Sequence, residues 1–167
     1  MAKENLVVIF GGRSSEHEVS CISVQTVAKA VDPERYNMTL VGITKEGQWK
    51  YYPSQDYAAI RENHWQEAEG VCDAALSPAR GQGLLILKPQ GLEIVPMDCC
   101  FPVLHGENGE DGSIQGLMQV AGVPCVGPGV TASASCMDKT MTKLVVGETG
   151  VRQANWYLAR RQSIQED

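Results

Sequence analysis

The sequence predicts an α/β fold of three layers, in which helices cover both faces of a mostly parallel β-sheet. A nearly continuous apolar run, NLVVIF at residues 5–10, is typical of a strand that is buried on both faces. Apolar residues then recur at helical spacing, and a second apolar run follows at residues 38–44. This order of strand, helix and strand is parallel and right-handed by strong precedent, and its continuation along the chain indicates the α/β class.

The size and composition of the chain exclude several classes of protein. Of its 167 residues, 43% are hydrophobic and 20% are charged, which is typical of a globular protein. Lysine and arginine number 14 against 20 aspartates and glutamates, and the resulting net charge of −6 argues against binding to nucleic acid. No apolar run reaches the roughly 18 residues that cross a bilayer, and the N-terminus lacks a signal-peptide pattern. We therefore expect a cytoplasmic protein, without membrane association, in which all six cysteines are reduced and act as small buried hydrophobes.

The first helix is expected at residues 16–31, after a tight turn with the sequence GGRSS. Ser15 followed by Glu18 fits a capping box, in which each side chain accepts a backbone N–H of the other residue. Asp32 and Pro33 end this helix, because proline cannot continue the hydrogen-bond ladder.

The middle of the chain, about residues 45–96, is less regular, and we expect it to be an insertion into a simpler core. Turn residues and β-formers alternate there, which predicts two hairpins. The expected elements are a turn and strand at 45–52, a helix within 55–69, a loop at 77–83, and strands at 84–88 and 92–95.

The regular alternation of strands and helices returns after residue 98, although one residue argues against the first of these strands. Pro102 weakens the case for a central strand, because proline has no N–H for the ladder. The expected elements are a strand at 99–105, a helix at 113–121 that stops at Gly122, a short strand at 123–126, a helix at about 131–147, a last strand at 155–159, and a polar tail at 160–167.

Two chemically rich loops follow predicted strands, at residues 11–18 and 105–112. In parallel sheets ligands bind beyond the carboxyl ends of the strands. We therefore expect both loops to open onto one crevice. The first loop offers backbone N–H groups at a helix N-terminus, which favour an anion, although it matches neither the dinucleotide fingerprint nor the phosphate-binding P-loop.

Glu16 and His105 are the candidate functional side chains of these loops. Glu16 can either complement the helix dipole or contact a ligand, whereas the capping box accounts for Glu18. His105 can act as a ligand contact, as a proton carrier or as a hydrogen-bonded structural residue. His17 and His64 are expected at the surface.

The remaining polar residues carry weaker signals. Glu107, Glu110 and Asp111 do not fit an EF-hand, so they are expected to cap the helix at 113 and to bond the loop backbone. Lys139 can either reach an anion or remain a surface side chain, and Lys143 fits a solvated face.

Several segments together resemble the D-alanine–D-alanine ligase family, whose longer members include ligases that join D-alanine to D-alanine, D-lactate or D-serine. These segments are FGGRSSEHEVS (10–20), GITKEGQW (42–49), FPVLHG (101–106), GEDG (109–112), QG (115–116) and SCMDK (135–139). Each segment is short, but the order and the residues of all the segments together are specific to the family, and the segments span most of the chain.

The resemblance implies an ATP-grasp enzyme, in which a Rossmann-like N-terminal domain precedes the ATP-grasp part. Residues 1–150 would form this substrate-binding domain, and residues 151–167 would begin the central domain. In the family's reaction, the carboxylate of one D-alanine takes the γ-phosphate of ATP. The amine of a second D-alanine then attacks the acyl phosphate, for peptidoglycan synthesis. ATP and magnesium or manganese would act in the full-length enzyme, and no metal ligand is expected in this chain.

The resemblance also implies roles for individual residues. Glu16 and His105 would be catalytic, with Glu16 holding the ammonium group of the first D-alanine and His105 beside its reacting carboxyl group. Ser14, Ser15 and Val19 would help to bind this substrate, and Lys139 would approach the phosphates of ATP.

We expect the chain to be the N-terminal part of such an enzyme, which binds D-alanine weakly and makes no dipeptide by itself. A homodimer is plausible for the family. Two alternatives remain at this stage, which are a ligase that uses D-serine or D-lactate and a non-catalytic module that binds a small ligand or a protein partner.

Overall fold

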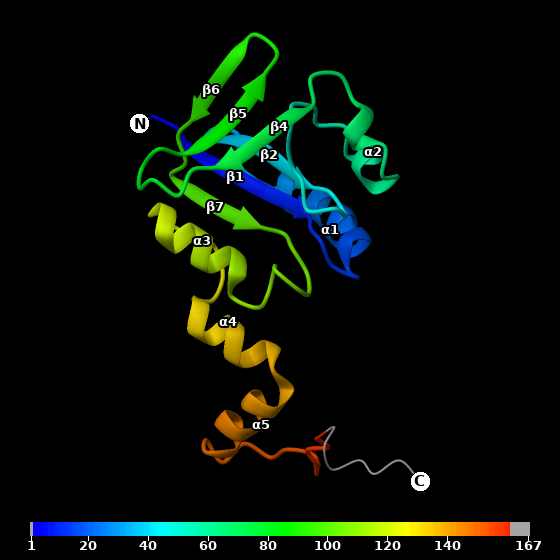
Figure 1. Cartoon of the computed structure of the whole chain (residues 1–167), viewed down its shortest axis with the longest axis vertical. Helices are drawn as coiled ribbons and strands as arrows, with labels where there is room; N and C mark the ends of the chain where they lie inside the picture. The colour runs from blue at the N-terminus through cyan, green and yellow to red at the C-terminus, as the bar shows by residue number, and fades with distance from the viewer. Residues whose placement is uncertain (1, 161–167) are drawn as a thin grey trace.

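The computed structural model describes residues 2–160, which form a seven-stranded sheet with helices and an extension of two further helices (Figure 1). The strands are β1 (Glu4–Gly11), β2 (Tyr36–Ile43), β3 (Trp49–Tyr52), β4 (Cys72–Leu76), β5 (Leu84–Lys88), β6 (Gly91–Val95) and β7 (Cys99–Pro102). The helices are α1 (His17–Ala30), α2 (Tyr57–Arg61), the single turn η1 (Trp65–Glu67), α3 (Ser113–Ala121), α4 (Val130–Met137) and α5 (Lys139–Gly147). No helix among these residues is long and apolar enough to cross a membrane.

The sheet confirms the predicted α/β class, but it is mixed instead of mostly parallel. Its strand order is β6-β5-β4-β3-β2-β1-β7. The strand β1 pairs in parallel with both β2 and β7, whereas every pair from β2 to β6 is antiparallel. The middle of the chain explains the difference, because its predicted strands β3, β5 and β6 extend the sheet outward from β2 together with β4, which was not predicted.

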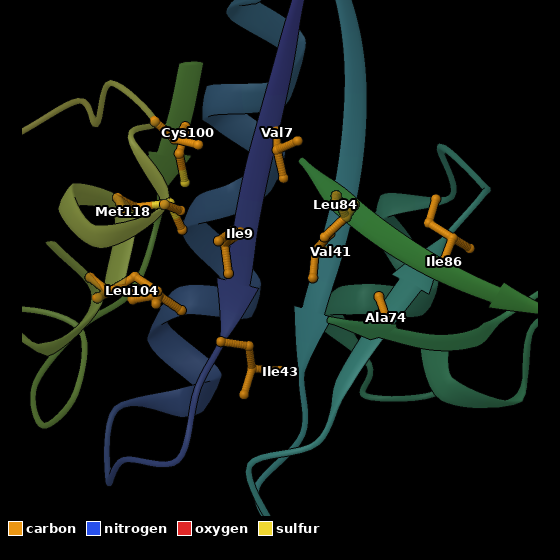
Figure 2. Packing of buried hydrophobic residues seen from close by; sticks show 13 residues of the cluster. Val7, Ile9, Val41, Ile43, Ala74, Leu84, Ile86, Cys100, Leu104 and Met118 are labelled. Atoms are coloured by element: carbon orange, nitrogen blue, oxygen red, sulfur yellow. The ribbon is translucent and has the colours of Figure 1, made fainter. Parts of the chain in front are cut away.

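The three predicted layers are confirmed by the two sides of β1. Leu6, Val8 and Phe10 pack on one face with α1, α2 and η1, whereas Val7 and Ile9 pack on the other face with α3. Figure 2 shows this second cluster, which runs from Met118 of α3, beside Cys100 and Leu104, past Val7 and Ile9 of β1 to Leu84 and Ile86 of β5. Burial on both faces is what the continuous apolar run at residues 5–10 predicts.

The start of α1 differs from the predicted capping box. Glu16 occupies the N-cap position without a side-chain cap, so Glu18 lies one residue too early for a box. The Glu18 carboxylate instead pairs with Lys45, in the turn between β2 and β3. The Ser14 hydroxyl, and not that of Ser15, accepts the N–H of Glu16, at 3.1 Å.

The second half of the domain follows the predictions closely around α3. Pro102 is tolerated because it is the last residue of β7, and α3 ends at Gly122 in the left-handed conformation, with φ +72°. The strand predicted at 123–126 is reduced to one parallel bridge between Cys100 and Cys125. Two hydrogen bonds form this bridge, since Cys100 N–H donates to the carbonyl of Pro124 and Val126 N–H donates to the carbonyl of Cys100, both at 2.8 Å.

Two predictions for the C-terminal segment are wrong. The single helix expected at 131–147 is divided into α4 and α5 by Asp138, whose backbone is extended and whose carboxylate accepts the N–H of Met141 at 2.9 Å. Residues 155–159 form no strand, because no described strand lies alongside to complete a ladder. Of the predicted polar tail, residues 161–167 lie outside the described part of the chain.

Candidate functional site

The two loops predicted to share a crevice do meet at the carboxyl ends of β1 and β7. The hydroxyl of Ser14 donates to the carbonyl oxygen of His105 at 2.8 Å, while it accepts the N–H of Glu16. A second link runs from the side-chain amide of Asn108 to the carbonyl oxygen of Arg13, at 3.4 Å. Residues about ninety positions apart in the sequence are thus joined by direct hydrogen bonds, one of them through a hydroxyl that touches both candidate residues.

A buried serine fixes the strands beneath these loops. Ser20 of α1 is fully buried, and its hydroxyl accepts the N–H of Gly11 at 2.7 Å and donates to the carbonyl oxygen of Val103. Gly11 ends β1, and Val103 follows β7. One side chain therefore holds the starts of both loops in register.

Glu16 lies at the positive end of the α1 dipole, beside the second loop. Its side chain is exposed, and a Cβ atom added to Gly106 would lie 2.6 Å from Glu16 Oε2. Gly106 also has φ +72°, which disfavours any side chain there. The carboxylate therefore lies against the residue that follows His105, in the space that a side chain at position 106 would enter. Sequence reasoning did not single out Gly106, although it follows His105 directly in the FPVLHG motif.

The imidazole of His105 has one nitrogen without a hydrogen-bond partner among residues 2–160. Its Nδ1 atom lies 4.0 Å from Oε1 of Glu110, and no described residue bonds its buried Nε2 atom. The other oxygen of Glu110 accepts the N–H of Gly106 at 2.7 Å, which fixes this carboxylate beneath the loop. The ring can therefore offer a donor or an acceptor to a ligand at the rim.

The acidic loop residues bond to the backbone, as predicted for Glu110 and Asp111. Asp111 accepts the N–H groups of Asn108 and Ser113, both at 2.9 Å. Burial alone would raise the pKa of this carboxyl group, but these N–H groups outweigh burial and hold the pKa below its ordinary value. Residues 2–160 contain no group of three His, Cys, Asp or Glu side chains that could hold a metal ion.

The prediction that His17 lies at the surface is wrong. Its side chain is 1% exposed, and Nδ1 donates to the carbonyl oxygen of Gly12 at 2.8 Å. The signal was present in the spacing, because His17, Ser20, Cys21, Val24 and Ala28 form the buried stripe of α1. His17 thus belongs to the support of the first loop, next to Glu16.

The other predicted site residues are less closely gathered. Ser15 and Val19 are exposed beside Glu16, and Val19 retains 47% of its accessible surface. Lys139 begins α5, which lies far from the sheet in Figure 1, so the structure does not bring it to Glu16 and His105. His64 is exposed, as predicted.

The fold and this rim define the chain as an α/β domain whose two candidate loops meet at the carboxyl ends of its parallel strands, where ligands bind in such folds. A family model described as D-ala D-ala ligase N-terminus matches residues 5–128. The chain therefore belongs to the family of D-alanine–D-alanine ligase N-terminal domains, as the resemblance of its motifs predicted.

Curated relatives and solved structures agree with this assignment. The chain is 42% identical to a D-alanine–D-alanine ligase of Sodalis glossinidius, over 89% of this chain and 41% of that protein. It is 37% identical to one from Thermoanaerobacter, over 99% and 46%. The structure of the VanG D-Ala:D-Ser ligase from Enterococcus faecalis matches with a TM-score of 0.82 at 36% identity, over 90% of this chain and 43% of that one. The ligase from Coxiella burnetii matches with a TM-score of 0.81 at 28% identity, over 95% and 45%. The chain thus spans less than half of the length of these relatives.

Proposed function

We propose that this chain is the N-terminal, D-alanine-binding part of an ATP-dependent D-alanine–D-alanine ligase. The observation that carries the proposal is the contact between the two loops at one rim, where the Ser14 hydroxyl links the backbone of Glu16, at the N-terminus of α1, to the backbone of His105. A negative side chain, a titratable ring and a positive helix end are the groups that a small amino acid with two opposite charges needs.

Glu16 is the group that binds the ammonium of the first D-alanine. An exposed carboxylate held against Gly106 can form charge-assisted hydrogen bonds with an ammonium group and so fix its orientation. Ser15 and Val19 flank this position, and the short methyl side chain of the substrate would pack against Val19. These contacts make the first loop the amino-acid recognition element.

His105 lies where the carboxyl end of such a substrate would fall. The half-buried imidazole of His105 and the dipole of α1 can both stabilise negative charge that develops when the carboxylate is phosphorylated and attacked. ATP, and magnesium or manganese to neutralise its phosphates, belong to the reaction of the whole enzyme. Within this chain Lys139 is the residue proposed to approach ATP, since it opens α5 with an exposed cationic side chain.

A second candidate function differs in the second substrate. The solved relative with 36% identity is a D-Ala:D-Ser ligase, and it matches over 90% of this chain. The first D-alanine site would be shared between the two specificities. Product analysis of the full-length enzyme with D-alanine, D-serine and D-lactate as acceptors decides between them.

Titration calorimetry with D-alanine tests the proposed site. Glu16→Gln keeps the shape of the side chain but removes its charge, so we expect D-alanine to bind about tenfold more weakly or worse. Glu18→Gln is the matched control, because this neighbouring carboxylate pairs with Lys45 instead of facing the rim. Equal affinity of Glu16→Gln and the unaltered chain would overturn the proposal. A protein-partner complex without any response to D-alanine would favour the binding-module alternative.

Two further parts of the proposal concern location and assembly. We place the enzyme in the cytoplasm, where ATP is available and where free cysteines, such as the six described here, stay reduced. We also propose a homodimer, in line with the family resemblance. Sedimentation velocity at several protein concentrations tests the dimer.

A further inference from the structure

Three of the six cysteines lie close together where the connection after α3 runs beside β7. Cys99 and Cys100 are neighbours in β7, and Cys125 belongs to the connection. The expectation that every cysteine is a small buried hydrophobe holds for Cys21 and Cys100 alone, because the other four keep part of their surface accessible. The cluster at β7 therefore combines a buried thiol with two that are only half-buried.

Cys100 and Cys125 lie directly opposite each other in a parallel β-bridge. The backbone of Cys100 is bonded on both sides of Cys125, to Pro124 and to Val126, so the two cysteines are held in register. Neighbouring strands lie about 4.8 Å apart, which is within the roughly 4.4–6.8 Å that separates the Cα atoms of a disulfide. An S–S bond between these two residues thus needs little movement of the backbone.

The side chains of Cys100 and Cys125 are also on the same face of the sheet. Cys100 belongs to the buried cluster on the α3 face, and Cys125 packs against that cluster. Figure 2 shows Cys100 near Met118 of α3. Cys99 packs against the cluster on the opposite face, because successive side chains of a strand alternate. Cys125 is therefore placed to react with Cys100 and not with Cys99.

The two facing thiols differ in reactivity. The hydrogen bond between them lowers the pKa of Cys125 and, together with burial, raises the pKa of Cys100. Cys125 is half-buried, so a small oxidant can reach it, whereas Cys100 has no accessible surface. An accessible thiol with a lowered pKa beside a second thiol is typical of cysteines that react with peroxide and then form a disulfide.

We propose that Cys125 and Cys100 are an oxidative modification site, at which hydrogen peroxide converts the two thiols to a disulfide. The Cys125 thiolate attacks one oxygen of the peroxide, the O–O bond breaks, and a sulfenic acid and hydroxide form. The sulfur of Cys100 then attacks the sulfur of Cys125, so the S–S bond forms while the S–O bond breaks. The departing hydroxide leaves as water with the proton of Cys100. In total, two thiols and one peroxide give one disulfide and two waters.

The disulfide would close a loop that contains the second candidate loop. Residues 101–124 lie between the two cysteines, and they include His105 and the whole of α3. Oxidation would thus add a covalent bond to the two backbone hydrogen bonds that already join β7 to the connection. Thiol–disulfide exchange with a small thiol would reverse it. This inference goes beyond the proposed ligase function and does not depend on it.

Peptide mapping by mass spectrometry tests the proposal on the 167-residue chain after treatment with hydrogen peroxide, with the remaining free thiols blocked before digestion. We expect a pair of peptides joined through Cys100 and Cys125, lighter by two hydrogens than the separate peptides and split by dithiothreitol. Oxidation of the chain unfolded in urea should instead spread the cross-links over all six cysteines, because the selectivity comes from the fold.

Three variants test the pairing, with circular dichroism to show that each remains folded. Cys125→Ser should abolish the cross-link. Cys136→Ser removes an exposed thiol elsewhere, and Cys99→Ser removes the neighbour that lies on the other face, so both should leave the cross-link unchanged. Mapping of the unaltered chain requires no variant to fold. A folded chain without a bond between Cys100 and Cys125 would overturn the inference, and so would a bond between Cys99 and Cys125 in its place.

Discussion

The substitution Ser20→Ala is expected to loosen the base of both loops at once. The Ser20 side chain has no accessible surface, and its hydroxyl accepts the N–H of Gly11 and donates to the carbonyl of Val103. Alanine fits the same space without strain, so the change removes two hydrogen bonds and little else. Water cannot easily replace the hydroxyl, because the site lies under α1 and between the ends of β1 and β7.

The magnitude follows from the two groups that lose their partner. A buried polar group without a partner costs about 1–3 kcal/mol, so we expect the free energy of unfolding to fall by about 2–4 kcal/mol. For a domain of this size that change lowers the melting temperature by roughly 5–15 °C. This loss is large compared with the effect of most surface substitutions, which stay within about 0.5 kcal/mol.

Urea unfolding followed by circular dichroism measures this difference. Ser23→Ala is the matched control on the same helix, since its hydroxyl only bonds back to the carbonyl of Val19, at 2.7 Å. We expect this control to stay within about 0.5 kcal/mol of the unaltered chain. If Ser20→Ala unfolded at the same urea concentration as Ser23→Ala, the argument that Ser20 joins the two loops would be refuted.

Three further predictions concern His17, Gly42 and Asp111. His17→Leu leaves the carbonyl of Gly12 unpaired, so we expect the free energy of unfolding to fall by about 1–3 kcal/mol in the same urea assay. His17→Asn should restore part of this loss, because the asparagine amide can donate to the same carbonyl. In Gly42→Ala the new Cβ would lie 2.5 Å from Cζ3 of the buried Trp65. We therefore expect the free energy of unfolding to fall by about 1–3 kcal/mol and the tryptophan emission to shift. Unchanged stability would contradict this packing. Asp111 has a lowered pKa in the folded chain, so its contribution is complete above its ordinary pKa of about 3.9 and is lost as the pH falls through the lower folded value. The difference in melting temperature between the unaltered chain and Asp111→Asn should therefore shrink as the pH is lowered from 6 to 2, and a constant difference would contradict it.

Local sequence signals predicted the elements whose cause is local. The helix α3 has the predicted bounds because Gly122 supplies its left-handed end, and the run at residues 5–10 is buried on both faces because nearly every residue in it is apolar. The hairpins of the middle segment were also predicted. These hairpins join the sheet at the edge of β2 and so make it mixed. Local sequence patterns do not predict this pairing, because it depends on contacts between distant parts of the chain.

The candidate site shows the same division between local and distant causes. The rule for parallel strands predicted that the loops of Glu16 and His105 lie at one rim, and a hydrogen bond between the two loops confirms that they meet. His17 was missed because its residue type was weighed without its position in the buried stripe of α1. The role of Gly106 depends on a side chain ninety residues away, so only the structure shows why a Cβ is excluded there.

The central claim is that the two loops form one site for D-alanine, with Glu16 on one side and His105 on the other. Amide chemical shifts measured while D-alanine is added to the isotope-labelled chain test it most directly. The account predicts that residues 14–19 and 105–107 shift together and follow a single binding curve, which Glu16→Gln weakens in both loops alike. Shifts confined to one loop, or two loops that titrate with different affinities, would contradict it.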